Sequence, residues 1–114
     1  MGMYCDVYGV EIKMTGLLAD AVEVVLGDDA FEYGVVVLTR GDVREVVSVM
    51  RTEILDGWAH KAVTMAEHFA RERGGEAEPL SNLQDILHFA SDVQRFERLC
   101  VWLAQTDEEK LAFG

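Results

Sequence analysis

The chain has 114 residues, half of them hydrophobic, with one proline and ten glycines. This composition excludes a disordered or low-complexity chain and predicts one domain spanning residues 1–114. The 21 acidic residues outnumber the 10 basic ones and give a net charge of −11. That charge disfavours binding to nucleic acid or to an anionic membrane, and it favours a protein partner with a basic surface.

The apolar pattern and the cysteines bear on location. No apolar run reaches the ~18 residues of a membrane span, and the first residues lack the charged and apolar regions of a signal peptide. Cys5 and Cys100 lie at opposite ends of the chain, without the spacing of a metal site. We therefore expect a cytoplasmic protein with no membrane association and two reduced thiols, with a disulfide joining the two ends as the alternative.

The first third of the chain predicts a small antiparallel sheet. Residues 3–13 alternate loosely and are rich in β-branched and aromatic side chains, which predicts one strand. Residues 17–26 fit both a helix face and a strand, and the hairpin-length connections on either side slightly favour the strand. The apolar run Val35–Leu38 predicts a central, buried strand within residues 31–39.

A long helix is predicted over residues 42–73. Asp42 provides an N-cap with Glu45 three residues later, and apolar residues then recur at steps of three and four. Gly57 predicts a kink or a break, because a glycine in mid-helix costs about 1 kcal/mol relative to alanine. Gly74 and Gly75 mark the end of the helix.

A second long helix is predicted from Ser81, which forms a capping box with Gln84, to about Gln105. Residues 107–111 are interpreted as a solvated tail or a last helical turn. The predicted fold is therefore α+β, with a small antiparallel sheet formed by residues 3–39 and followed by two long antiparallel helices.

The three histidines are candidate metal ligands. His60, His68 and His88 each have an acidic residue three or four positions away, which makes a potential two-ligand half-site. No His-Glu-x-x-His motif is present, and nothing in the sequence makes two such pairs converge. The favoured interpretation is exposed histidines near acids, with no metal, no cofactor and no catalytic residue assigned.

Two groups of residues are candidates for binding a partner. The first consists of acidic residues in connecting segments: Asp28, Asp29, Glu32, Glu76 and Glu78. The second is a strip along the last helix, formed by Asp92, Arg95, Leu99 and Trp102, in which large apolar groups and an arginine stand where the helical period predicts solvent. The alternative, which we favour for the strip, is that residues 99–104 are buried on all sides.

These features predict a small, acidic, non-enzymatic binding or regulatory protein. Residues 1–41 and 75–114 each carry a net charge of −5, against −1 for residues 42–74. The sharpest form of the hypothesis is an inhibitor, of phage anti-defence or immunity-protein type, that mimics nucleic acid on a basic surface of its partner. The alternatives are a homo-oligomeric interaction module that uses the Trp102 strip, and a metal-dependent enzyme that uses helix-borne histidines and acids.

Overall fold

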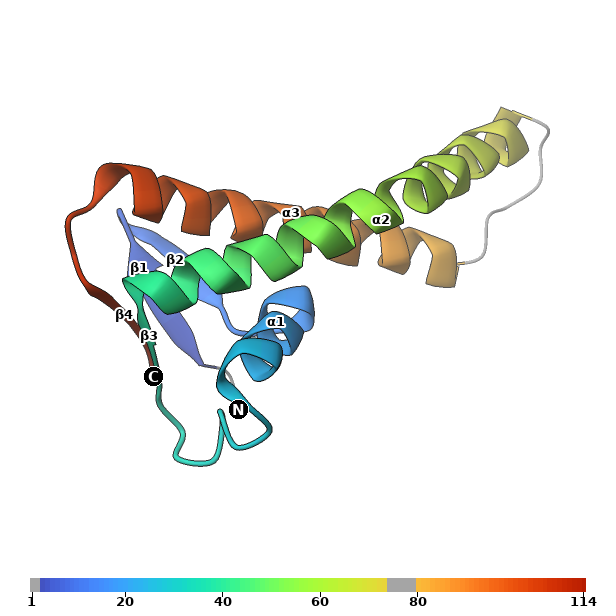
Figure 1. The fold of residues 1–114 in the computed structure, drawn as a ribbon. Coiled ribbons are helices and arrows are strands. Elements are labelled where there is room, and N and C mark those ends of the chain that lie inside the picture. The colour runs from blue at the N-terminus through green and yellow to red at the C-terminus, as the bar shows by residue number, and fades with distance from the viewer. Residues whose placement is uncertain (1–2, 74–79) are drawn as a thin grey trace.

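The computed structural model describes residues 3–73 and 80–114, with side chains described for residues 3–57 and 87–114. The elements in chain order are β1 (Tyr4–Val7), β2 (Val10–Lys13), α1 (Gly16–Leu26), β3 (Val36–Thr39), α2 (Arg40–Arg73), α3 (Leu80–Gln105) and β4 (Lys110–Phe113). Figure 1 shows α2 and α3 side by side above the strands and α1. The α+β class is confirmed, with two small antiparallel sheets and three helices in this part of the chain.

Residues 3–13 form a hairpin and not the single strand that was predicted. β1 pairs with β2 antiparallel, and Val7 stands opposite Val10. The two residues between them, Tyr8 and Gly9, have φ values of +53° and +77°, as a type I′ turn requires. Because the turn reverses the chain, Ile12 joins Cys5 and not Tyr4 on the buried face of the hairpin.

Residues 17–26 belong to helix α1, so the predicted three-stranded meander is wrong. Leu18, Ala21 and Val22 are completely buried, at the i, i+3 and i+4 spacing that gives a helix one apolar face. That face packs on the core, with α2 and α3 alongside. Tertiary packing therefore decided between two interpretations that the sequence left open.

The partner of β3 is the C-terminal strand β4, which corrects the prediction of a solvated tail or helical turn for residues 107–111. Val36 stands opposite Phe113 and Leu38 opposite Leu111, and all four side chains are buried. Tyr4 and Gly114 exchange two backbone hydrogen bonds of 3.3 and 3.1 Å. These bonds join the start of β1 to the residue that follows β4, so the two sheets meet there, and the β3–β4 sheet includes the C-terminal strand and not residues 3–39 alone.

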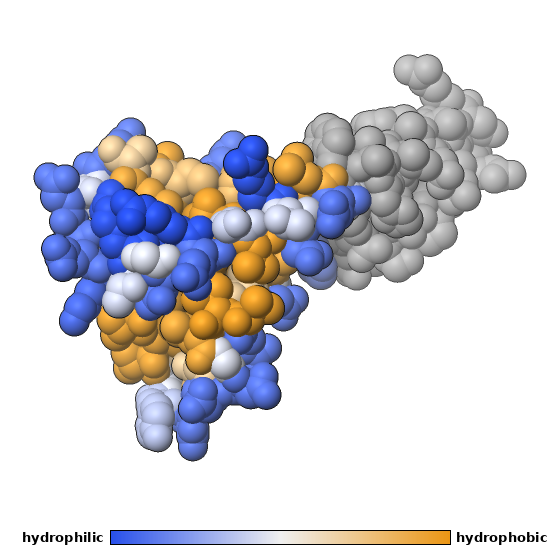
Figure 2. Space-filling view, in the orientation of Figure 1, coloured by the Kyte–Doolittle hydropathy of each residue, from blue (hydrophilic) through white to orange (hydrophobic). Residues whose placement is uncertain are grey.

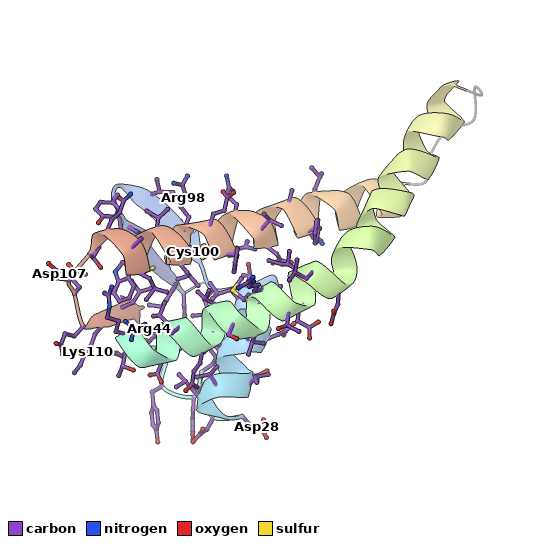
Figure 3. The ribbon with its side chains drawn as sticks, turned by 45° about the horizontal axis from the view of Figure 1, so that its top comes forward. Asp28, Arg44, Arg98, Cys100, Asp107 and Lys110 are labelled. Atoms are coloured by element: carbon purple, nitrogen blue, oxygen red, sulfur yellow. The ribbon has the colours of Figure 1, made fainter. Side chains whose placement is uncertain are left out.

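The N-cap of helix α2 lies three residues before the predicted one. The Asp42 N–H donates to Thr39 Oγ1 at 3.1 Å, and the Thr39 N–H donates to the Asp42 carboxylate at 3.0 Å. The pair is a capping box with Thr39 as N-cap and Asp42 in the position usually filled by Glu or Gln. The prediction at Gly57 was a kink or a break. The helix runs 34 residues to Arg73 without a break, and Figure 3 shows it changing direction along its length.

The predicted pair of long antiparallel helices is confirmed in part. Figure 1 shows α3 returning alongside α2, but the side chains of residues 58–86 lie outside the described part of the molecule. Arg40 fastens the end of α3 nearest the sheet, because its guanidinium donates to the carbonyl oxygens of Leu103, Thr106 and Glu108. It also lies 5.4 Å from the centre of the Trp102 ring. No described helix is both long and apolar enough to cross a bilayer.

Candidate functional site

A polar cleft of about 670 Å³ lies between α1, α2 and α3. Its walls combine cations, acids and small polar groups from three helices and the end of β2. The polar residues that line it are Lys13, Thr15, Asp20, Glu53, His88, Ser91, Asp92 and Arg95. Both signs of charge meet here, so the cleft lacks the uniform field that would select an anion or a cation.

The carboxylate of Asp92 on α3 connects this helix to α1 at the cleft. Its carboxylate accepts a hydrogen bond of 3.1 Å from the Leu17 N–H at the start of α1, and another of 3.1 Å from Arg95. Thr15, the local N-cap residue of α1, makes no side-chain capping bond. Gly16 leaves room for the carboxylate, since a Cβ atom there would lie 2.5 Å from an Asp92 oxygen. Asp92 therefore caps α1 across 75 residues of sequence.

This geometry assigns Asp92 and Arg95 a structural task. Both were candidates for binding a partner, but they pair with each other and their side chains are only about 20% exposed. A carboxylate that already accepts two hydrogen bonds is expensive to redirect, because its donors would be left without acceptors. The two residues therefore stabilise the packing of α1 against α3.

Leu99 and Trp102 are buried, which corrects their place among the partner-binding candidates. Their side chains are 0% and 2% exposed, in one core with Phe113 and Leu111 of β4. Phe96 and Leu103, on the same helix, are only partly buried. The buried face of α3 is rotated toward Trp102 relative to the face that the helical period predicts. The reason is that strand β4, which was not predicted, and Arg40 of α2 cover the Trp102 side.

Few of the described side chains are suited to nucleophilic attack or to metal binding. Burial, and secondarily the charge of Asp6, raise the pKa of the Cys5 thiol to about 12. Burial also raises the pKa of Cys100, while Arg51 lowers it by a smaller amount and Glu97 raises it slightly. Both cysteines are free, so the alternative disulfide does not form, and protonated thiols are poor nucleophiles.

His88 is the histidine whose surroundings are described. It lines the cleft together with Asp92, but no set of three His, Cys, Asp or Glu groups suited to a metal ion occurs among the described side chains. His60 and His68 lie outside those side chains.

A second surface is formed by the end of α1, the following loop and β3. It differs from the cleft because it carries acidic and exposed apolar side chains but no cation. Residues 14–39 contain five acidic residues and no lysine or arginine. Four large apolar side chains are exposed in this stretch: Val24 by 70%, Tyr33 by 84%, Val35 by 54% and Val37 by 47%. Figure 2 shows hydrophobic atoms gathered below α2, where Figure 1 places α1 and β3.

We call this surface the α1–β3 face. It consists of Glu23, Val24, Asp28, Asp29, Glu32, Tyr33, Val35 and Val37, all exposed. The carboxylates of Asp28, Asp29 and Glu32 make no hydrogen bond or ion pair with any side chain that the structure describes. Three predicted partner-binding residues therefore lie together and unpaired, while Glu76 and Glu78 fall outside the described residues.

Residues 14–39 hold no lysine or arginine, so the cations of the chain belong to other segments. In Figure 3, Asp28 projects away from α2 and α3, and Arg44, Arg98 and Lys110 lie apart from it on other elements. The acidic side chains of the α1–β3 face are therefore not neutralised locally, so they present a negative field to solvent.

The apolar part of this face was missed from the sequence. Val35–Leu38 predicted a strand buried on both faces, but only Val36 and Leu38 are buried, while Val35 and Val37 are exposed. The exposure of Val35 and Val37 could have been predicted from strand alternation only if one face of β3, and not both, had been expected to be buried.

Known proteins offer no precedent: no protein-family model, no curated protein and no solved structure matches this chain. The two surfaces described above are therefore the basis for a functional proposal.

Proposed function

We propose that this protein binds a basic surface of a protein partner through its α1–β3 face. The observation that carries the proposal is the set of unpaired carboxylates, Asp28, Asp29 and Glu32, in the same stretch of chain as exposed Val24, Tyr33, Val35 and Val37. Protein interfaces commonly place apolar side chains at the centre and charged ones at the rim. This face has both parts.

The pairing state of the carboxylates favours their use in recognition. Asp92 would have to give up the Leu17 N–H and Arg95 before it met a partner. Asp28, Asp29 and Glu32 would lose only water. Their field, added to the net charge of −11, would speed the encounter with a basic surface and oppose the approach of acidic ones.

The narrowest form of the proposal is an inhibitor that occupies the nucleic-acid-binding surface of its partner. A basic groove built for phosphates offers the charge that this face lacks. In this form, short duplex DNA or RNA should compete with the protein for its partner. Simultaneous binding of nucleic acid and protein would restrict the proposal to a basic surface of another kind.

The oligomeric alternative loses its original site. It relied on a strip containing Leu99 and Trp102, and both residues are buried within the chain's own core. Self-association through the α1–β3 face would bring like charges together, because every copy carries the same acids.

The test compares two charge-neutralised variants. Asp28→Asn/Asp29→Asn/Glu32→Gln changes the proposed face, and Asp107→Asn/Glu108→Gln/Glu109→Gln makes the same change of charge at the exposed α3–β4 connection. Wild type and both variants are immobilised and exposed to extract of the source cells at about 50 and 300 mM salt, a range over which screening increases strongly. Proteins retained by wild type and by the second variant, and lost by the first variant and at high salt, support the proposal.

Two results would contradict it. One is retention that does not change with salt, since recognition by charge must weaken as ions screen it. The other is equal loss of the retained protein from both variants, which would show that total charge matters and the α1–β3 face does not.

A further inference from the structure

Strand β3 has one free edge within the described part of the chain. Its other edge pairs with β4. The Arg40 N–H donates to the Glu109 carbonyl at 2.9 Å, while the Thr39 N–H turns the other way, to Asp42. Since hydrogen-bonded and non-hydrogen-bonded pairs alternate along an antiparallel ladder, Val36 and Leu38 bond to β4. The N–H and C=O groups of Val37 therefore point to the free edge.

The other outer strand, β2, is protected in a way that β3 is not. The exposed side chains of β2 are the charged Glu11 and Lys13, and α3 residues such as Arg95 and Arg98 form a small cleft with it. Charged side chains and covering elements are the usual means of blocking strand addition. The exposed side chains beside the β3 edge are Val35 and Val37, which carry no charge and add apolar surface.

We propose that an extended segment of the basic partner adds to β3 as an antiparallel strand, pairing with the free N–H and C=O of Val37. This inference rests on the proposed function and specifies its mode. Strand addition supplies affinity through main-chain hydrogen bonds, while side chains on alternate positions supply specificity. Alternate residues of the segment lie against Val35 and Val37 on the outer face of the sheet.

For an antiparallel segment, charge determines which end carries the basic residues. The chain enters β3 from the loop that carries Asp28, Asp29 and Glu32. In an antiparallel arrangement, the residues that follow the added strand continue beside this loop. The segment therefore has β-branched residues first and lysine or arginine after them. A second copy of this chain fits less well, because residues 14–39 would bring their acids and no cation.

The test uses two synthetic peptides of equal composition and charge. The first is acetyl-VTVTVGKKKK-amide and the second is its reversed sequence, each labelled for fluorescence anisotropy. The first peptide should bind wild type at least about fivefold more tightly than the second, and neutralising Asp28, Asp29 and Glu32 should weaken it about tenfold or more. Equal or tighter binding of the reversed peptide overturns the antiparallel arrangement.

The hydrogen bonds are tested on both sides of the ladder. Two analogues of the peptide, one N-methylated at its valines and one at its threonines, each block one edge of the extended strand. Only the analogue whose blocked edge faces β3 should bind about tenfold more weakly. On the protein, Val37→Pro removes the free N–H as well as apolar side-chain contact, whereas Val37→Ala loses only side-chain contact, so Val37→Pro should weaken binding several-fold more than Val37→Ala does.

The outcomes separate the two proposals. Binding that depends on Asp28, Asp29 and Glu32 but is unchanged by either N-methylated peptide and by Val37→Pro overturns strand addition and leaves the acidic face intact. Failure of every peptide to bind at millimolar concentration also overturns it. The methylated peptides leave the protein unaltered, so this result stands even where Val37→Pro fails to fold. Sedimentation that finds a dimer built on the same edge would replace the partner by a second copy.

Discussion

Two groups of carboxylates on this molecule differ in what they contact. Asp92 accepts hydrogen bonds from the start of α1 and from Arg95, whereas Asp28, Asp29 and Glu32 have no such contacts among the described residues. A carboxylate with internal donors contributes to folding, because removing it leaves buried groups unpaired. A carboxylate without them contributes charge alone, and that charge is available to a partner. Stability and binding should therefore respond to different acids.

The largest expected effect on stability comes from Gly16, which makes room for Asp92. Gly16 has φ of +60°, and an added Cβ would lie 2.5 Å from the Asp92 carboxylate. Gly16→Ala should therefore lower the free energy of unfolding by about 2 to 3 kcal/mol, as left-handed strain and a disturbed cap combine. Urea denaturation followed by circular dichroism measures the change.

Gly9 supplies the control for this substitution. It also has a positive φ, of +77°, but an added Cβ would meet no atom within 4 Å. Gly9→Ala should lower stability by only about 1 kcal/mol, the strain alone. Equal losses from the two substitutions would show that the Gly16–Asp92 contact has no energetic importance.

Removal of the long-range cap should have the next largest effect. Asp92→Ala leaves the Leu17 N–H and Arg95 without their acceptor, so we expect a loss of about 1 to 2 kcal/mol in the free energy of unfolding. Asp92→Asn retains an acceptor and should lose less than half as much. The nearby, exposed Gln94→Ala is the control and should leave the urea midpoint unchanged.

The buried Cys5 thiol should make the stability of the fold depend on pH. Its pKa is about 12 in the fold, against 9.0 as an isolated group. Above pH 9 the unfolded chain loses this proton while the folded chain keeps it, so stability should fall as pH rises from about 9 towards 12. At pH 10 the loss relative to pH 8 should be about 1 kcal/mol.

Cys5→Ala isolates this contribution. It should have a lower stability at pH 8, because a buried side chain is shortened, but a smaller decrease between pH 8 and pH 10 than wild type. Parallel pH profiles of the two proteins would show that Cys5 does not carry the effect.

The smallest effect on stability is expected on the α1–β3 face. Asp28→Asn/Asp29→Asn/Glu32→Gln removes three negative charges and changes the net charge from −11 to −8. Because these groups have no internal partners, the free energy of unfolding should stay within about 0.5 kcal/mol of wild type, with relief of repulsion favouring a small gain. A loss above about 1 kcal/mol would mean that these carboxylates support the fold.

Local signals were the more predictable part of this fold. Helices α2 and α3 were expected from apolar periodicity, and β3 from the run at Val35–Leu38. The cap of α2 was misplaced by only three residues, since Thr39 and Asp42 are close in sequence. The exposure of Asp28, Asp29 and Glu32 could be predicted, because charged residues in a segment that connects two elements usually face solvent.

Long-range pairing could not be predicted in the same way. The cap of α1 comes from Asp92, and the partner of β3 is β4, at the far end of the chain. Neither choice leaves a trace in local periodicity, because each depends on which elements meet in the core. The same is true of Leu99 and Trp102, whose solvent exposure was decided by the position of β4 and Arg40.

The most direct test of the account is the affinity of the salt-sensitive partner, once purified, for three forms of this protein. Isothermal titration calorimetry gives the dissociation constants for wild type, for the Asp28/Asp29/Glu32 variant and for the matched Asp107/Glu108/Glu109 variant. We predict weakening of about tenfold or more for the first variant and less than about threefold for the second, with both as stable as wild type. Equal weakening by the two variants, or none by the first, would contradict the assignment of binding to the α1–β3 face.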